Sequence, residues 1–390
     1  MWKTVKLGEL CTKITDGSHN PPKGIETSSH LMISSKNVLD DEINFEKPRY
    51  LSEDDFAQEN KRTDVQQGDV LLTIVGTIGR CAVVGDLTQP FTLQRSVAVL
   101  KPKRETIDSR FLMYTLRGML NELISGARGV AQKGIYLKSL KRLAIPLPPL
   151  AEQQRIVAKL DAAFAEIDRA VEIEGAKLSS VGALIAAKLE SMYNDKRFEQ
   201  KQLKDICKFV GGSQPPKSTF EYEQSDSNIR LIQIRDYKSD KHLTYIPKDK
   251  AKRWCSASDV MIGRYGPPIF QILRGIEGAY NVALMKAVPT AEMDNDYLFY
   301  FLSNRRIQSY VINKSSRAAG QSGVNKDALE PYPIYIPPLE EQHSIVQRTR
   351  SLIAQTDILE KSCRDKLKAM LSLKSSILSQ ELQPPQSEAA

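Results

Sequence analysis

The 390-residue chain contains the same pattern of residues twice, and this repetition constrains its fold more than any single motif. Residues 145–154 read I-P-L-P-P-L-A-E-Q-Q, and residues 334–343 read I-Y-I-P-P-L-E-E-Q-H. Four further blocks match in the same order: 7–11 with 203–207, 17–23 with 212–217, 68–71 with 258–261, and 132–135 with 321–324. The spacing between matched blocks drifts from 196 to 189 residues, as a duplication with loop insertions would produce. Each copy should therefore form the same kind of structural unit.

Each copy begins with a segment that is typical of a globular domain. These segments are residues 1–149 and 197–337. Short apolar runs such as 70–75 and 229–234, broken by glycine and aspartate, predict strands, and short helical patterns accompany them. A hydrophobic content of 41% with 26% charged residues is ordinary for a globular protein. We therefore expect two domains of mixed α/β class.

Each copy ends with a long helical pattern, predicted over residues 150–196 and 338–382 as two spacer helices. A helix of about 40 residues is about 60 Å long and cannot bury its apolar stripe alone. We expect the two helices to pair as an antiparallel coiled coil with pseudo-two-fold symmetry. Alternatively, each helix packs only on its own globular domain. The residues expected to pair are Ile156, Leu160, Ile167, Leu178, Ile185, Ile345, Leu352, Leu359, Met370 and Ile377. Residues 383–390 are predicted to be a disordered tail.

The overall charge and the cysteine pattern exclude several classes of protein. A net charge of +8 and a pI near 9.0 permit a nucleic-acid or anionic-membrane partner. No apolar run is long enough to cross a bilayer, and the first residues lack the apolar core of a signal peptide. The five cysteines are scattered and form no C-x-x-C pair, which disfavours a disulfide framework or a zinc site. These features predict a cytoplasmic protein without a metal centre.

The sequence also lacks the motifs of the enzymes that act on DNA. Asn20-Pro21-Pro22 resembles the N-P-P-aromatic motif of amino-methyltransferases, but the next residue is Lys23, which cannot stack on a flipped base as an aromatic ring does. There is no G-x-x-x-x-G-K-[ST] motif for an ATP-driven motor. We expect no catalytic residue and no cofactor bound by this chain.

The arrangement of motifs resembles that of a known family. An I-x-x-P-P-L-x-E-Q motif introduces both long helices, and the first domain adds K-L-G-E-L-C at 6–11, G-D-V-L-L-T-I-V-G-T-I-G-R at 68–80 and Q-K-G-I at 132–135. This pattern is similar to that of the specificity subunits (HsdS family) of type I restriction-modification systems. The resemblance implies that each globular domain is a target recognition domain, which reads one half of a bipartite, asymmetric DNA site. It implies that the helix pair acts as a ruler between the halves and as a docking site for methyltransferase subunits.

The resemblance also implies partners. These are double-stranded DNA, two methyltransferase subunits and two restriction-translocase subunits, with no membrane. S-adenosylmethionine, ATP and Mg would be bound by those subunits. This chain would be a non-catalytic component of a restriction endonuclease and adenine methyltransferase complex that defends against phage.

DNA contact requires cationic and amide or hydroxyl side chains on exposed loops. The candidates in the first domain are Ser18, His19, Asn20, Lys23, Lys36, Asn37, Arg80, Gln94, Arg95, Arg128, Gln132 and Lys133. The candidates in the second domain are Ser213, Gln214, Lys217, Arg235, Tyr237, Lys238, Arg264, Tyr265, Arg317 and Gln321. For any one of them, the alternative is a solvated surface position. For the whole chain, the alternative is a helical scaffold or adaptor whose basic domains bind DNA non-specifically.

Overall fold

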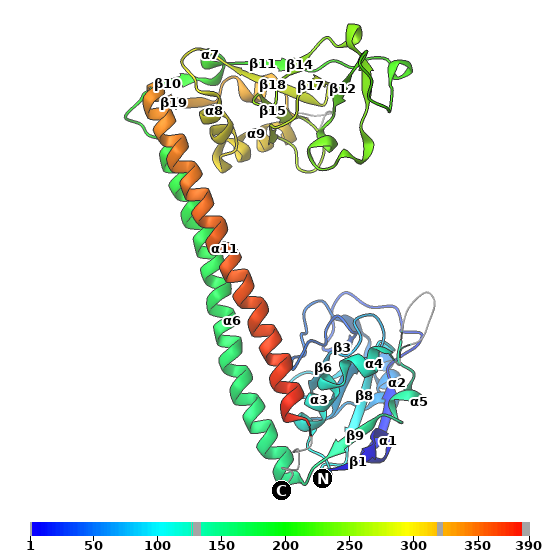
Figure 1. The fold of residues 1–390 in the computed structure, drawn as a ribbon. Coiled ribbons are helices and arrows are strands. Elements are labelled where there is room, and N and C mark those ends of the chain that lie inside the picture. Colours follow the sequence, from blue (N-terminus) through cyan, green and yellow to red (C-terminus); the bar gives the residue numbers. More distant parts are fainter. Residues whose placement is uncertain (1, 126, 128–133, 318–322, 384–390) are drawn as a thin grey trace. The chain divides into compact units, whose positions relative to one another are not determined.

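The computed structural model describes residues 2–125, 127, 134–317 and 323–383 (Figure 1). The chain divides into two compact units: unit 1 is Met1–Ile173 with Lys366–Ala390, and unit 2 is Glu174–Asp365. Two long helices, α6 (Leu150–Tyr193) and α11 (Leu339–Glu381), contribute residues to both units. Each unit thus combines one globular domain with about half of each long helix. None of the described helices is long and apolar enough to cross a membrane.

Unit 1 is a mixed α/β domain with three small sheets. Its elements are β1 (Lys3–Lys6), α1 (Leu7–Leu10), β2 (Cys11–Asp16), β3 (His30–Ile33), β4 (Arg49–Leu51), α2 (Glu53–Thr63), β5 (Val70–Thr73), β6 (Cys81–Val83), β7 (Phe91–Leu93), β8 (Val97–Pro102), α3 (Ser109–Gly118), α4 (Leu120–Ser125), α5 (Leu137–Leu140) and β9 (Ala144–Leu147). The strand orders are β2-β8-β5-β6, β4-β3-β7 and β1-β9. All pairs are antiparallel except β3 with β7.

Strand β5 lies between two cores, and its first three residues are apolar. All four of its residues are buried. Val70 and Leu72 pack in the main core with α3 and α6, whereas Leu71 points to the opposite face and packs in a second core with β3 and β7. Alternate residues of a strand face opposite sides, so a strand between two cores needs apolar residues on both of its faces.

Unit 2 resembles unit 1 in its order of strands, but the third of its sheets has four strands where that of unit 1 has three. Its elements are β10 (Glu199–Gln202), α7 (Leu203–Ile206), β11 (Cys207–Gly211), η1 (Lys217–Thr219), β12 (Asn228–Ile232), η2 (Ile234–Tyr237), η3 (Asp240–His242), β13 (Tyr245–Pro247), η4 (Lys248–Lys250), β14 (Trp254–Cys255), β15 (Val260–Gly263), β16 (Gln271–Leu273), β17 (Gly278–Tyr280), β18 (Leu284–Pro289), α8 (Asn295–Leu302), α9 (Arg305–Arg317), α10 (Lys326–Leu329) and β19 (Pro333–Ile336). The orders β11-β18-β15-β16 and β10-β19 match those of unit 1, and β12 pairs in parallel with β17 as β3 does with β7.

The glutamine of the repeated P-P-L-x-E-Q motif fastens each long helix to its globular domain. Gln153 is fully buried, and its Oε1 accepts a hydrogen bond from the backbone N–H of Asp108 at 2.8 Å. Its Nε2 donates to the carbonyl oxygens of Thr106 at 3.1 Å and Pro148 at 2.9 Å. Gln342 makes the same three contacts in unit 2. Each glutamine therefore satisfies three backbone groups at the junction, which explains why the motif occurs twice.

The helices α6 and α11 pair as an antiparallel coiled coil. In unit 1, Lys159 Nζ lies 2.6 Å from Glu381 Oε1, and Asp168, further along α6, pairs with Lys374, which comes earlier in α11. In unit 2, the hydroxyls of Tyr193 and Thr349 lie 2.9 Å apart. In unit 1, residue numbers increase along α6 in the direction in which they decrease along α11, so the two helices run in opposite directions there (Figure 1).

The residues predicted to pair differ in their surroundings. Those at the helix starts are buried and pack on the globular domains as well as in the helix pair: Ile156, Leu160, Ile167 and Ile345. Those further along are half-buried: Leu178, Ile185, Leu352, Met370 and Ile377. Met370 and Ile377 pack against the same core as Ile156. Leu359 is 39% exposed, so the prediction that it lies in the seam is wrong. The two packing alternatives are therefore combined, because the helix starts serve both contacts.

Candidate nucleic-acid interface

Backbone hydrogen bonds bring the polar loops of unit 1 together. Gly17 N donates to Val97 O at 3.2 Å, Ser18 N to Leu93 O at 2.8 Å, and Arg95 N to Ser18 O at 2.9 Å. Similar bonds connect the loops after β3 and β5, and the segment before α5, to this pair of loops. We call the resulting surface rim 1, made of residues 17–23, 34–37, 74–80, 94–96 and 134–136.

The same bonds recur in unit 2 and define rim 2, made of residues 212–217, 233–238, 264–266, 281–283 and 323–325. Gly212 N donates to Leu284 O at 3.0 Å, and Ser213 N to Tyr280 O at 3.2 Å. Val324 N donates to Arg264 O at 3.0 Å, as Ile135 N does to Ile74 O at 2.9 Å in unit 1. The bonding pattern thus equates residues of the two rims one by one.

A glycine is required at the same position of both rims. A Cβ atom on Gly17 would lie 1.9 Å from the carbonyl oxygen of Leu93, and a Cβ atom on Gly212 would lie 1.9 Å from that of Asn281. Because the obstacle is backbone, no side chain could move aside to relieve it. A second equivalent pair, Gly76 and Gly266, has φ of +83° and +90°, a region that favours glycine. The glycines therefore shape the loops of both rims.

Most predicted residues of the first domain lie on rim 1. The exposed ones are His19, Asn20, Lys23, Lys36 and Arg95, and the half-buried ones are Arg80 and Gln94. Ser18 and Asn37 are buried. The Asn37 amide accepts from Ser34 N at 3.0 Å and donates to the carbonyl oxygens of Asn44 and Glu46, so it holds the loop shape. The structure therefore assigns Ser18 and Asn37 a structural position, contrary to their prediction as DNA contacts.

The predicted residues of the second domain divide in the same way. Gln214, Lys217, Arg235, Lys238 and Tyr265 are exposed, and Ser213, Tyr237 and Arg264 are half-buried.

Two of the half-buried residues, Tyr237 and Arg264, face into the domain, contrary to their prediction as DNA contacts. The hydroxyl of Tyr237 is buried, and burial raises the pKa of this phenol. The Arg264 guanidinium donates to the carbonyl oxygens of Val324 at 2.9 Å and Val282 at 3.2 Å, so it ties three segments of rim 2 together. Burial of its hydroxyl keeps Tyr237 from reaching a base, and these bonds hold the Arg264 guanidinium within the rim. Arg128, Gln132, Lys133 and Gln321, and the side chain of Arg317, lie outside the described residues.

The structure adds two features to the rims that sequence reasoning missed. Asp16, which is buried, accepts from Arg62 of α2 and lies 2.9 Å from Nε2 of His19, so Arg62 belongs to rim 1 although it comes from a distant helix. Asn281 of rim 2 occupies the position of Gln94, since Asn281 N donates to Ile232 O as Gln94 N does to Ile33 O. Alignment of the two copies could have found Asn281, whereas no local pattern indicated Arg62.

A cavity of about 440 Å³ opens at rim 1. Its floor is apolar, with Ile74 and Ile135, and its polar edge includes His19 and Arg95. In unit 2, Arg264 replaces Ile74, and its guanidinium is bonded across the corresponding position. The two rims therefore share a backbone frame but present different shapes and chemistry.

Known proteins share both the sequence pattern and the fold. The family described as "Type I restriction modification DNA specificity domain" matches residues 1–177 and 195–369. The EcoBI specificity subunit of Escherichia coli is 25% identical over 349 residues, which cover 78% of this chain and 71% of that protein. The putative MjaX specificity subunit of Methanocaldococcus jannaschii is 22% identical, over 94% of this chain and 89% of that protein.

Two solved structures have the same fold. One is a chain from work on complex assembly and conformational transition of the type I R-M system, with a TM-score of 0.74, 19% identity, and coverage of 99% of this chain and 98% of that chain. The other is the HsdS subunit from Thermoanaerobacter tengcongensis, with a TM-score of 0.60, 20% identity, and coverage of 99% and 97%. With two matched copies of the domain, two equivalent rims and an antiparallel helix pair, the chain belongs to the type I restriction-modification DNA specificity family.

Proposed function

We propose that this chain is the DNA sequence-recognition subunit of a type I restriction-modification enzyme. The observation that carries the proposal is the match of both copies to the DNA specificity domain, each copy with its own polar rim. Cationic side chains on the rims, such as Lys36, Arg95 and Lys217, suit phosphate contact, and amides such as Gln94 and Gln214 suit base edges. Catalysis belongs to the other subunits of such an enzyme, as the specificity role implies.

The two rims would read two different half-sites. Their backbone frames are equivalent, but the exposed residues differ. In the alignment of the two copies, His19 corresponds to Gln214 and Arg95 corresponds to Val282. Base readout depends on which donors and acceptors meet the groove, so different rims should select different bases. The recognised site would thus be bipartite and asymmetric.

The helix pair would separate the half-sites and dock the other subunits. We expect two methyltransferase and two restriction-translocase subunits per chain, which would bind S-adenosylmethionine, ATP and Mg. The cytoplasm, where such subunits meet DNA, is the compartment that this proposal requires.

The test is to co-express the chain with its methyltransferase subunit and map methylated bases across the host genome. We expect one bipartite motif with a fixed gap. Replacing residues 1–149 with the corresponding domain of a relative should then change one half of the motif only. A stable complex that methylates no defined site, or a swap that alters both halves, would contradict the proposal. Tight binding that ignores sequence would favour the scaffold alternative, and salt dependence alone would not separate the two.

A further inference from the structure

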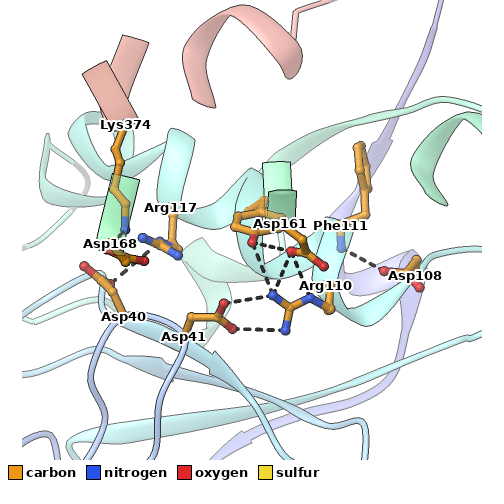
Figure 2. Close-up of polar contacts among 10 residues, drawn as sticks. Asp40, Asp41, Asp108, Arg110, Phe111, Arg117, Asp161, Asp168 and Lys374 are labelled. Carbon is orange, nitrogen blue, oxygen red and sulfur yellow. Dashed lines mark hydrogen bonds and ion pairs between the residues drawn. The ribbon is translucent and has the colours of Figure 1, made fainter. Parts of the chain in front are cut away.

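An ion-pair cluster joins the globular domain of unit 1 to its long helix. Arg110, in α3, lies with Nη2 2.8 Å from Oδ1 of Asp161 in α6 and 2.8 Å from Oδ2 of Asp41 (Figure 2). Burial opposes its charge, but the hydrogen bond to Asp161 and the charge of Asp41 raise the pKa of Arg110 above its usual range. Asp41 belongs to the loop that follows Lys36 of rim 1, so the cluster connects the helix to the segment beside the rim.

Unit 2 has a similar cluster in which the central residue and its partner on the long helix have the opposite charges, while the third charged residue comes from a different loop than in unit 1. Asp296, in α8, lies with Oδ2 2.7 Å from Nη2 of Arg350 in α11, and with Oδ1 2.5 Å from Nη1 of Arg274. A carboxylate between two guanidinium groups in unit 2 thus stands where a guanidinium lies between two carboxylates in unit 1.

The two central residues and their helix partners occupy equivalent positions. Asp108 and Asp294 cap α3 and α8 by accepting from the backbone N–H three residues later, and the central residue is the second after each cap. The helix partner is the eighth residue after the buried glutamine in both copies, at Asp161 and Arg350. The reversal is therefore a change at matched positions.

We call each ion-pair cluster between a globular domain and its long helix a joint. A tyrosine in each joint fits either charge pattern. The Tyr114 hydroxyl donates to Asp161 Oδ1 at 2.5 Å. Tyr300 follows Asp296 by the same number of residues as Tyr114 follows Arg110, and its hydroxyl raises the pKa of the Arg350 guanidinium. A phenol hydroxyl can donate to a carboxylate or accept from a guanidinium, so it tolerates either sign. The charges differ between the two units, whereas the tyrosine, which can interact with either charge, is the same in both.

These pairs serve selectivity more than stability. Arg110 and Asp161 side chains are each 38% exposed, and in such surroundings an ion pair adds little net stability. Two like charges held in the same place are unfavourable, however, and repulsion against wrong partners is a common source of specificity.

We propose that the charge-reversed joints make each globular domain specific for its own long helix, so that the two domains of this chain cannot exchange places. A domain 1 docked on α11 would bring Arg110 against Arg350, and a domain 2 docked on α6 would bring Asp296 against Asp161. The joint residues are positioning residues, since they act on the rims through the docking of the domain. The effect of docking on DNA recognition rests on the proposed function, whereas docking itself can be measured without DNA.

The experiment measures amide hydrogen exchange of α3 and of the first half of α6 in the full chain. Asp161→Arg should accelerate exchange there about ten-fold, since Arg110 then faces a like charge. The triple variant Asp41→Asn, Arg110→Asp, Asp161→Arg should return exchange to within about two-fold of the original rate. Asn is chosen at position 41 because the backbone there has φ of +65°, which Asn tolerates. Glu166→Arg, a reversal on α6 at a side chain that is 72% exposed, is the matched control.

The outcomes separate clearly. If the triple variant regains the original exchange rates, matched charges hold the domain on its helix, which supports the proposal. If the triple variant exchanges as fast as Asp161→Arg, or if Asp161→Arg behaves like Glu166→Arg, the proposal is overturned. Should Asp161→Arg fail to fold, a soluble triple variant with the original exchange rates supports the proposal, and an insoluble one overturns it. A failed methylation test with intact charge rescue would refute the proposed function and leave the joint standing.

Discussion

Units 1 and 2 have the same frame and different rims. The frame consists of contacts that recur at matched positions, such as the close backbone approach at Gly17 and Gly212 and the buried amide of Gln153 and Gln342. The rims keep the frame's hydrogen bonds but change the side chains that face outward. A position is retained where the backbone leaves no alternative, and it varies where the side chain meets only solvent or a ligand.

The domain–helix joint belongs to neither category. Arg110 and Asp296 are matched in position but opposite in charge, and so are their partners on the long helices. What both units share there is complementarity between two surfaces. Comparison of the copies therefore distinguishes three kinds of position: frame residues that are the same in both units, joint residues that change together with their partners, and rim residues that vary independently.

Substitution of the rim glycines should have the largest effect. Gly17→Ala and Gly212→Ala each place a methyl group 1.9 Å from a carbonyl oxygen, so we expect a loss of about 3 kcal/mol or more in unfolding free energy. Thermal or denaturant unfolding measures this loss. Gly211→Ala is the matched control, since nothing lies within 4 Å of its Cβ position. Equal stability of Gly212→Ala and Gly211→Ala would break the equivalence of the two frames.

Removal of the buried glutamine amide should have the next largest effect, and it should be similar in both units. Gln153→Ala leaves the Asp108 N–H and two carbonyl oxygens without partners, which should cost about 2 kcal/mol, and Gln342→Ala should cost about the same. The exposed neighbour Gln154→Ala serves as the control in the same unfolding assay. A large loss in one unit and none in the other would show that the two junctions are not equivalent.

Removal of exposed rim cations should leave stability unchanged and weaken DNA binding. If Lys36 and Arg95 each contact a phosphate, Lys36→Ala or Arg95→Ala should lower the slope of log K against log salt by about 0.9. The assay is a salt titration of DNA affinity with the assembled methyltransferase complex. Lys6→Ala, on β1, is the control. An unchanged slope in both rim variants would mean that rim 1 does not face the phosphates, and the same test on Lys217 examines rim 2.

The sequence alone was enough to find the architecture. The repeat, the two long helices and the family resemblance all depend on periodic patterns and on local motifs, which remain legible without coordinates. Their physical causes are local too: a glycine where a carbonyl crowds the backbone, a proline pair before a helix, and a three-four step of apolar residues. The loops that form the rims were also identified, because polar residues gathered beside those glycines.

Only the tertiary structure decided which polar side chains of these loops face outward. Asn37, Tyr237 and Arg264 have the same chemistry as an exposed DNA contact, but Asn37 is bonded within its own loop, the Tyr237 hydroxyl is buried, and Arg264 is bonded to Val324, which is far away in the sequence. Arg62 reached rim 1, and Asp161 reached Arg110, in the same way. Burial and pairing are properties of three-dimensional neighbours, so a residue's own sequence context determines what it can do but not which partner it meets.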